Sequence, residues 1–253
     1  MKLIVPYLGV LLLLFACTPK NHTKVKPEHG SFDYFALTQQ RAKLFQSAAY
    51  LIDLRINDAG TKYSITTEVY VSGDSTAFYG RGYVGKGAFK GHVVNDVATI
   101  YFRSENEYYS GPLGNLGNGA ECSSPGEVLL YVLSLLSSSN SIDKSNPPVG
   151  LKTKKNAIEY LDGRFDHTIR LEDGLFPKKE ILVDKTCRDS IVINYMDAGR
   201  SFPFYKVEDA LYYSGLYDFR ARGFVREQQY NIDIKQSKFE LDIPSSATLL
   251  DRI

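Results

Sequence analysis

The sequence predicts a mainly β protein with a few helices, in which most strands follow one another in an antiparallel sheet. Of its 253 residues, 18 are Tyr and 14 are Phe, whereas Trp is absent. Aromatic and β-branched side chains suit pleated, half-buried surfaces. Short runs of alternating apolar and polar residues, separated by brief turn sequences, recur along the chain. Because short connections join antiparallel neighbours, this pattern favours a meander of strands.

Composition excludes some classes of function. The chain has 30 Lys and Arg against 29 Asp and Glu, a formal charge of +1, so no basic excess indicates a nucleic-acid partner. Hydrophobic residues make up 43% and charged residues 23%, which is typical of a folded chain and not of a disordered one. We therefore expect one folded domain over residues 31–253.

The first sixteen residues predict a signal peptide. Lys2 supplies a positive charge, and Leu3–Ala16 is apolar apart from Tyr7. The apolar stretch is shorter than the ~20 residues that a membrane-spanning helix needs. Leu14–Cys17 resembles a bacterial lipobox, which implies cleavage before Cys17, diacylation of its thiol and acylation of the new amino group. A plain signal peptide cut elsewhere, with Cys17 incidental, is the alternative.

Residues 17–30 predict a lipidated linker. Thr18–Gly30 contains Pro, Gly and Lys with almost nothing apolar, and fully extended it would reach about 40 Å. By resemblance to Gram-negative lipoproteins, the absence of Asp after Cys17 implies sorting to the outer membrane. Two or three acyl chains anchor a protein stably, whereas one chain binds marginally. We therefore expect a protein anchored to the outer membrane by lipid, with its domain facing the periplasm.

The two remaining cysteines predict a disulfide bond. With Cys17 lipidated, Cys122 and Cys187 form an even pair in an oxidising compartment. In the chain-entropy model, closing the loop between them would stabilise the fold by about 4 kcal/mol. Two independent buried thiols are the alternative. A metal or redox site is disfavoured, because neither a CxxC pattern nor a neighbouring His accompanies the pair.

Periodicity predicts one helix followed by many strands. Apolar residues at near-helical spacing, with Ser31 as a cap, predict a helix over Ser31–Ala49. The period then changes to two. Gly80–Gly85 spells GxGxxG, but strand patterns on both sides favour a glycine-rich β corner over a phosphate-binding turn. The predicted strands are Ile52–Ile56, Tyr63–Val71, Thr76–Tyr83, Ala88–Val94, Ala98–Phe102, Glu107–Gly111, Ala157–Leu161, Phe165–Leu171, Glu180–Asp184, Ser190–Tyr195, Leu211–Leu216, Phe219–Glu227, Tyr230–Ile234 and Phe239–Ile243.

A second helix is predicted in the middle of the chain. Ser124–Glu127 forms a capping-box pattern with Pro125 at the first helical position, and it opens an apolar stretch over Val128–Leu136. Apolar residues occupy nearly every side of this helix. It must therefore lie against or inside a hydrophobic surface.

From about Tyr34 onward the chain resembles the LolA/LolB-like half-barrel superfamily. The resemblance rests on the order of lipobox, helix, strands, short apolar helix and further strands, and on Phe239–Pro244 at the end. The chain is also similar to uncharacterised outer-membrane lipoproteins that share Pro177-Lys178 before a strand and Ile193-Asn194-Tyr195. In that superfamily a curved antiparallel sheet forms an incomplete barrel, helices plug it, and the cavity takes acyl chains or lipids.

The resemblance implies a half-barrel whose apolar concave face is covered by Val128–Leu136, because such a face needs helices or lipid to exclude water. Receptor members probe the membrane with an apolar residue on a protruding loop. Carrier members lack a lipid anchor, so Cys17 argues against a shuttling role. The implied cavity residues are Ile52, Leu54, Ile56, Ile65, Val69, Leu129, Leu133 and Leu136, and the candidate loop residues are Tyr83, Val84, Leu113 and Leu116.

The sequence predicts no catalytic residue, no metal site, no cofactor and thus no enzyme. Neither HExxH nor GxSxG occurs, and His92 and His167 stand singly in strand patterns. The pairs Tyr108-Tyr109 and Tyr212-Tyr213 would each place one ring in the core and one outside, since side chains alternate across a strand. This arrangement requires no ligand.

Two functions are therefore expected. In the first, a tethered binding protein holds acyl chains, lipid or a lipoprotein in the concave face. In the second, a structural or assembly lipoprotein uses the same scaffold to dock another envelope protein, without lipid cargo. A large open apolar cavity would favour the first function, whereas a filled cavity beside an exposed aromatic patch would favour the second.

We predict that Cys17→Ser leaves a folded protein that no longer associates with membranes, because the anchor lies in the linker and not in the core. Membrane fractionation of the variant beside the unchanged chain tests this. Persistent pelleting of the variant with membranes would contradict it.

Overall fold

A computed structural model of the chain describes residues 34–82, 87–95, 97–112, 122, 128, 132, 148–162, 165–196 and 204–251. Along these residues lie helix α2 (Tyr34–Leu44), strands β1 (Ser47–Asp58), β2 (Thr61–Ser72), β3 (Ser75–Gly82), β4 (Gly87–Val94), β5 (Val97–Phe102), β6 (Glu107–Pro112), β7 (Lys152–Lys154), β8 (Ala157–Asp162), β9 (Phe165–Glu172), β10 (Phe176–Asp184), β11 (Asp189–Met196), β12 (Lys206–Ser214) and β13 (Phe219–Tyr230), the short 3₁₀-helix η1 (Gln236–Lys238) and strand β14 (Thr248–Leu250).

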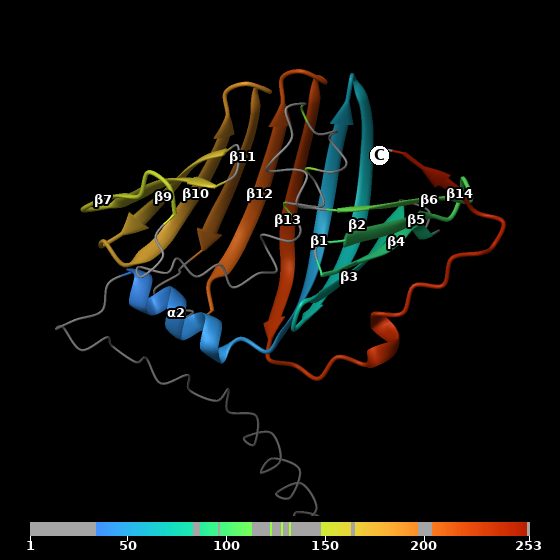
Figure 1. Ribbon diagram of the computed structural model, residues 1–253, viewed down its shortest axis with the longest axis horizontal. Coiled ribbons are helices and arrows are strands. Elements are labelled where there is room, and N and C mark those ends of the chain that lie inside the picture. Colours follow the sequence, from blue (N-terminus) through green and yellow to red (C-terminus); the bar gives the residue numbers. More distant parts are fainter. Residues whose placement is uncertain are drawn as a thin grey trace, which may run out of the picture.

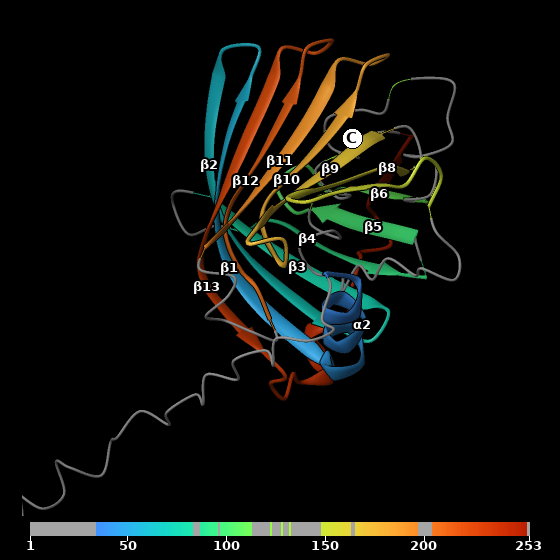
Figure 2. The same cartoon turned by 90° about the vertical axis from the view of Figure 1, so that its left-hand side faces the viewer.

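All fourteen described strands belong to one sheet. Its order is β14-β6-β5-β4-β3-β2-β1-β13-β12-β11-β10-β9-β8-β7. The neighbours pair antiparallel, apart from β14, which runs parallel to β6. Because β14 and β7 each have one neighbour, the sheet does not close into a barrel. Figure 2 shows it curling around α2, which lies on its concave side.

Strand β1 joins the two halves of the sheet. It pairs with β2 on one side and with β13, more than 160 residues later in the chain, on the other. The β1–β2 hairpin turns at Ala59 and Gly60, both with positive φ, as a two-residue hairpin requires. The side chain of Asn57 accepts a hydrogen bond from the Gly60 N–H at 3.1 Å. This turn lies between the predicted strands Ile52–Ile56 and Tyr63–Val71.

The first helix is shorter than predicted. The sequence predicts a helix over Ser31–Ala49, but α2 ends at Leu44 and β1 begins at Ser47. Pairing with strands on both sides outweighs the helical spacing of these residues. The Asn231 side chain fixes the change of direction, since it donates to the Leu44 carbonyl and accepts from the Gln46 N–H, both at 2.9 Å.

The C-terminal segment crosses the convex face of the sheet and is not the pair of strands predicted there. Beyond β13, residues 231–247 form no strand, and β14 joins the sheet edge beside β6 (Figure 1). Phe239, Leu241 and Ile243 do alternate with more exposed residues, which explains the error. The Tyr79 hydroxyl donates to the Lys238 carbonyl, and the Lys238 ammonium lies 3.0 Å from the Tyr70 hydroxyl.

A disulfide bond joins Cys122 to Cys187, with Cα atoms 5.5 Å apart, and so links the middle of the chain to the β10–β11 turn. An Asp184 carboxylate oxygen accepts the N–H groups of Thr186 and Cys187 at 2.8 and 3.0 Å. The turn is thus held in shape where the cross-link attaches.

Glycine on the concave face allows large neighbours to fill the core. Gly91 on β4 lies opposite Phe78 on β3 and Ile100 on β5. A Cβ atom at residue 91 would approach the Phe78 ring to 2.5 Å and the Ile100 Cγ1 to 2.6 Å.

We predict that Gly91→Ala lowers the free energy of unfolding by about 1–3 kcal/mol, because the Phe78 ring would have to move within a packed core. Urea denaturation measures this. Lys90→Ala, the adjacent residue on the opposite face, is the control and should change stability by less than about 0.5 kcal/mol. Equal losses in the two variants would contradict this account of the core.

Candidate functional site

The concave face is apolar along most of the sheet. Cross-strand partners share a face, and the register places Thr67 and Val225 on either side of Ile52. Helix α2 identifies the concave side, because Tyr34 and Phe35 pack against Ile158 and Ile169 of β8 and β9. All the cavity residues expected on β1 and β2 lie on this concave face: Ile52, Leu54, Ile56, Ile65 and Val69.

Burial decreases along the concave face away from α2. Ile52 and Val69 are 2% and 1% exposed, whereas Leu54, Ile56 and Ile65 are only partly buried. Tyr63, on the same face near the β1–β2 turn, is 51% exposed. The β1–β2, β10–β11 and β12–β13 turns lie at the end of these strands away from α2 (Figure 1). The apolar strip is therefore covered at the helix end and open at the other.

The predicted middle helix is described at two positions. Val128 and Val132, one helical turn apart, are both helical, and they are 1% and 6% exposed in the same hydrophobic cluster as Ile52 and Val69. They therefore cover part of the concave face. Cys17, Tyr83, Val84, Leu113, Leu116, Leu129, Leu133 and Leu136 lie outside the described residues.

A cation lies on the buried side of α2. Arg41 shares a helical stripe with Tyr34, Leu37 and Thr38, all of which are buried. Its guanidinium carbon sits 4.6 Å from the centroid of the Tyr205 ring. Its Nε is buried without a hydrogen-bond partner among the described residues, and so is the Tyr205 hydroxyl.

Tyrosines surround this arginine. Tyr195 and Tyr205 meet edge to face, with ring centroids 6.0 Å apart, and Tyr50 and Tyr230 do the same at 6.1 Å. The Tyr230 hydroxyl donates to the Tyr205 carbonyl at 2.8 Å. We call Tyr50, Tyr195, Tyr205 and Tyr230 the tyrosine cage.

The cage tyrosines stay neutral at ordinary pH. Burial raises the pKa of Tyr205 to about 12. The Arg41 charge opposes this rise, whereas the Glu180 charge adds to it. Burial raises the pKa of Tyr195 well above 10, with a smaller contribution from Glu180. Burial likewise raises the pKa of Tyr50 well above 10, with a smaller contribution from Tyr230. The hydroxyls therefore offer dipoles and ring faces to Arg41 but no formal negative charge.

The Glu180 carboxylate lies in the same region but is shared by other groups. Its Oε2 is 3.6 Å from the Nε2 of His167, which is buried and packs against the Tyr160 ring at 4.5 Å. Tyr195 also hydrogen bonds to it. Among the described residues no ion pair joins Arg41 to a carboxylate. His167 is thus a core histidine.

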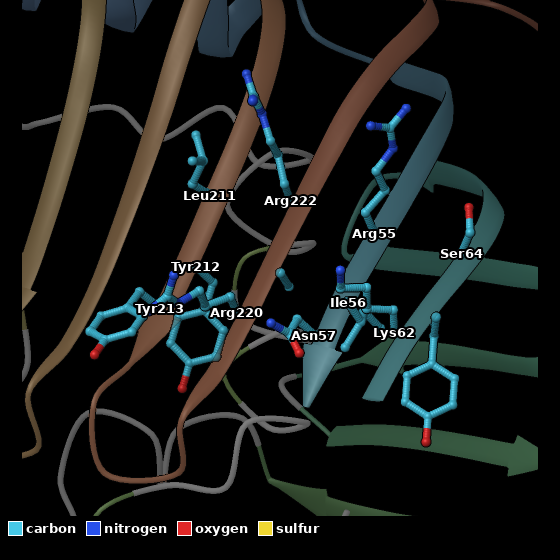
Figure 3. A pocket seen from close by; sticks show the side chains of 12 residues that line it. Arg55, Ile56, Asn57, Lys62, Ser64, Leu211, Tyr212, Tyr213, Arg220 and Arg222 are labelled. Atoms are coloured by element: carbon cyan, nitrogen blue, oxygen red, sulfur yellow. The ribbon is translucent and has the colours of Figure 1, made fainter. Parts of the chain in front are cut away.

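A second concavity lies on the face opposite α2. It is a groove of about 550 Å³ that runs across β12, β13, β1 and β2. Two rows of outward-facing side chains form its walls, and the row between them forms its floor (Figure 3). One wall is Leu211, Arg222, Arg55 and Ser64, and the other is Tyr213, Arg220, Asn57 and Lys62. The floor is the backbone of Tyr212, Ala221, Ile56 and Tyr63, whose side chains belong to the concave face.

The walls of this convex groove carry unneutralised positive charge. Arg222 pairs with the buried Asp209, donating from its Nε at 2.8 Å. Arg55, Arg220 and Lys62 form no ion pair with any described residue. Arg55 lies 5.0 Å from the Phe224 ring and Arg220 5.2 Å from the Tyr213 ring. Tyr213 is 40% exposed while Tyr212 is buried, which confirms the alternation expected for this pair.

Other kinds of site find no support among the described residues. No three His, Cys, Asp or Glu side chains there could hold a metal ion together. Within the same residues, no helix has the length and apolar character needed to cross a bilayer.

Solved structures with the same architecture are known. A DUF1329 family protein from Desulfovibrio piger matches with a TM-score of 0.50 and 11% identity, covering 81% of this chain and 95% of that one. A putative outer membrane lipoprotein-sorting protein domain from Vibrio parahaemolyticus matches at 0.44 and 8%, covering 80% and 92%. A LolA superfamily protein from Nitrosomonas europaea matches at 0.44 and 7%, covering 83% and 99%.

The chain folds as an unclosed half-barrel, and its fold is similar to that of the DUF1329 family protein. At these identities the likeness concerns the fold and not an activity. No protein-family model and no curated protein matches the chain. The half-barrel expected from the resemblance is thus confirmed as architecture.

Sequence reasoning missed the two charged features. The prediction of the first helix considered apolar residues alone and so omitted Arg41, whose guanidinium lies against the Tyr205 ring. The phase of the helix, set by Tyr34 and Leu37, was the available signal. The convex groove gave no local signal, because its walls combine four strands, two from each end of the chain.

We predict that Tyr230→Phe lowers the free energy of unfolding by about 1–3 kcal/mol, because it removes the main donor to the buried Tyr205 carbonyl. The urea midpoint measures the loss. Tyr50→Phe is the matched control and should cost less, since its hydroxyl reaches the Tyr230 hydroxyl only at 3.5 Å. A larger loss for the control would show that the cage is not organised around Tyr205.

Proposed function

We propose that the chain is an envelope lipoprotein that binds acyl chains, as free lipid or as part of a lipoprotein, on the concave face of its half-barrel. The observation that carries the proposal is the graded apolar strip along β1 and β2. It is covered near α2 and partly exposed at Leu54, Ile56 and Ile65. A soluble domain that leaves such a surface open gains free energy when apolar ligand displaces water from it.

The remaining parts of the proposal come from the sequence. Removal of residues 1–16, lipidation of Cys17 and a linker to residue 30 would hold the domain at the outer membrane, facing the periplasm. A lipid-binding domain tethered in this way stays close to its ligand, which raises the effective ligand concentration. We assign it a role in lipid or lipoprotein handling and no enzymatic activity.

A second candidate function is docking of another envelope protein, without lipid cargo. The convex groove favours it, because Arg55, Arg220 and Lys62 present positive charge beside exposed Tyr213. Arginine and tyrosine are enriched where proteins bind one another. The partner would present an acidic segment to this groove.

We predict that dodecanoate raises the melting temperature of the domain, because a ligand that binds only the folded state stabilises it by about 2.7 kcal/mol at a hundred times its Kd. Leu54→Asn, on the concave face, should weaken binding about tenfold, a loss of about 1.4 kcal/mol. Thermal melts with and without ligand measure both effects.

Leu211→Asn is the matched control, since Leu211 is equally half-buried but lines the convex groove. It should retain the full shift in melting temperature. If no acyl ligand changes the melting temperature of the unchanged protein, acyl binding is wrong and the docking function takes its place.

A further inference from the structure

The charge of Arg41, which has no ion-pair partner among the described residues, indicates which kind of lipid the concave face would bind. A buried cation is costly unless it is paired or hydrogen bonded. Arg41 has no carboxylate partner among the described residues, and its Nε has no hydrogen-bond partner there. The other residues of its helical stripe are buried against the sheet. A residue placed there for packing alone would be apolar, like Leu37.

The surroundings of Arg41 are built to keep it charged and in place. The Tyr205 ring faces the guanidinium, and such contacts stabilise cations. Burial works to lower the pKa of Arg41, but the nearby phenols raise it overall, so the group remains a cation. Tyr205 adds a second unsatisfied donor, its hydroxyl, to the same place. An anion there would satisfy both groups at once.

The distance along β1 matches the length of a lipid chain. From Tyr50 of the cage through Ile52 and Leu54 to Ile56 is six residues, or about 20 Å of extended strand. A bilayer core about 30 Å thick holds two acyl chains end to end, so one chain spans about 15 Å. An acyl chain whose anionic group lies at Arg41 is therefore long enough to reach the partly exposed Leu54 and Ile56.

We propose that Arg41 and the Tyr205 hydroxyl form an anion subsite, so that the half-barrel selects amphiphiles with a carboxylate or phosphate group over neutral ones of equal chain length. The inference rests on the proposed function and sharpens it. Guanidinium groups bind carboxylate and phosphate oxygens with paired, charge-assisted hydrogen bonds. Carboxylate and phosphate share this chemistry, and the experiment separates them.

The test uses the full mature protein and displacement of a neutral fluorescent probe, N-phenyl-1-naphthylamine. The competitors are dodecanoate, dodecyl phosphate and 1-dodecanol, which share one chain length. The unchanged protein should bind at least one anionic competitor tenfold or more tightly than the alcohol. The two anions rank carboxylate against phosphate. Equal affinity for all three would overturn the subsite but leave acyl binding intact, whereas failure of every competitor to bind would overturn the proposed function itself.

Two variants locate the preference. Arg41→Met should remove it while leaving the affinity for dodecanol within about twofold, because Met preserves the apolar length of the side chain. Arg55→Met should keep the preference for anionic competitors, because it removes an exposed arginine from the convex groove. If Arg41→Met does not fold, Arg41→Gln is measured in its place. The preference of the unchanged protein for an anionic competitor over dodecanol tests the subsite without either variant. An unaltered preference in a folded Arg41 variant would refute the assignment.

Discussion

An antiparallel sheet that curls without closing must cover its concave side chains with something other than a second sheet. Here β14 and β7 leave the sheet open, and the concave face carries Ile, Val, Leu, Phe and Tyr from nearly every strand. Helix α2 covers one end, and Val128 and Val132 cover part of the middle. Apolar area that stays exposed at the open end costs about 25 cal/mol per Å², so an apolar ligand that covers it would bind favourably.

The same constraint explains why polar groups gather around α2. A helix laid into a concave sheet brings its own backbone dipoles and long side chains into a low-dielectric space, where each must find a partner. Tyr195 and Tyr230 solve this by combining large apolar rings with hydroxyls that reach Glu180 and the Tyr205 carbonyl. The Tyr205 hydroxyl and Arg41 are the exceptions, because the hydroxyl has no partner among the described residues and the charge is surrounded by phenols and not by an anion.

Period-two alternation predicted twelve of the fourteen described strands, β1–β6 and β8–β13. The alternation of Ile52, Leu54 and Ile56 put these residues on the concave face, and the register that pairs them with β2 and β13 preserves it. An even cysteine count indicated the bond between Cys122 and Cys187. These features are local, or depend only on composition.

Features set by long-range packing were not predictable. The residues 45–50 have helical spacing, but strand pairing on both sides overrides it. Phe239, Leu241 and Ile243 alternate like a strand, although they pack on the convex face without a ladder, because extended chain has the same period whether or not it pairs. The three-residue strands β7 and β14 are too short to show a period at all.

The position of the charges decides what each can do. Without its first sixteen residues the chain would carry 29 basic and 29 acidic side chains, so net charge does not explain a function. Charges at the exposed convex groove act through water and are screened over about 8 Å at physiological salt, so they govern the rate of encounter and make it salt-dependent. Arg41 is partly buried and its Nε is fully so, and the same charge interacts more strongly there than in open water. In the proposed functions, the interior arginine would therefore act on which ligand is retained, and the exterior arginines on which surface approaches.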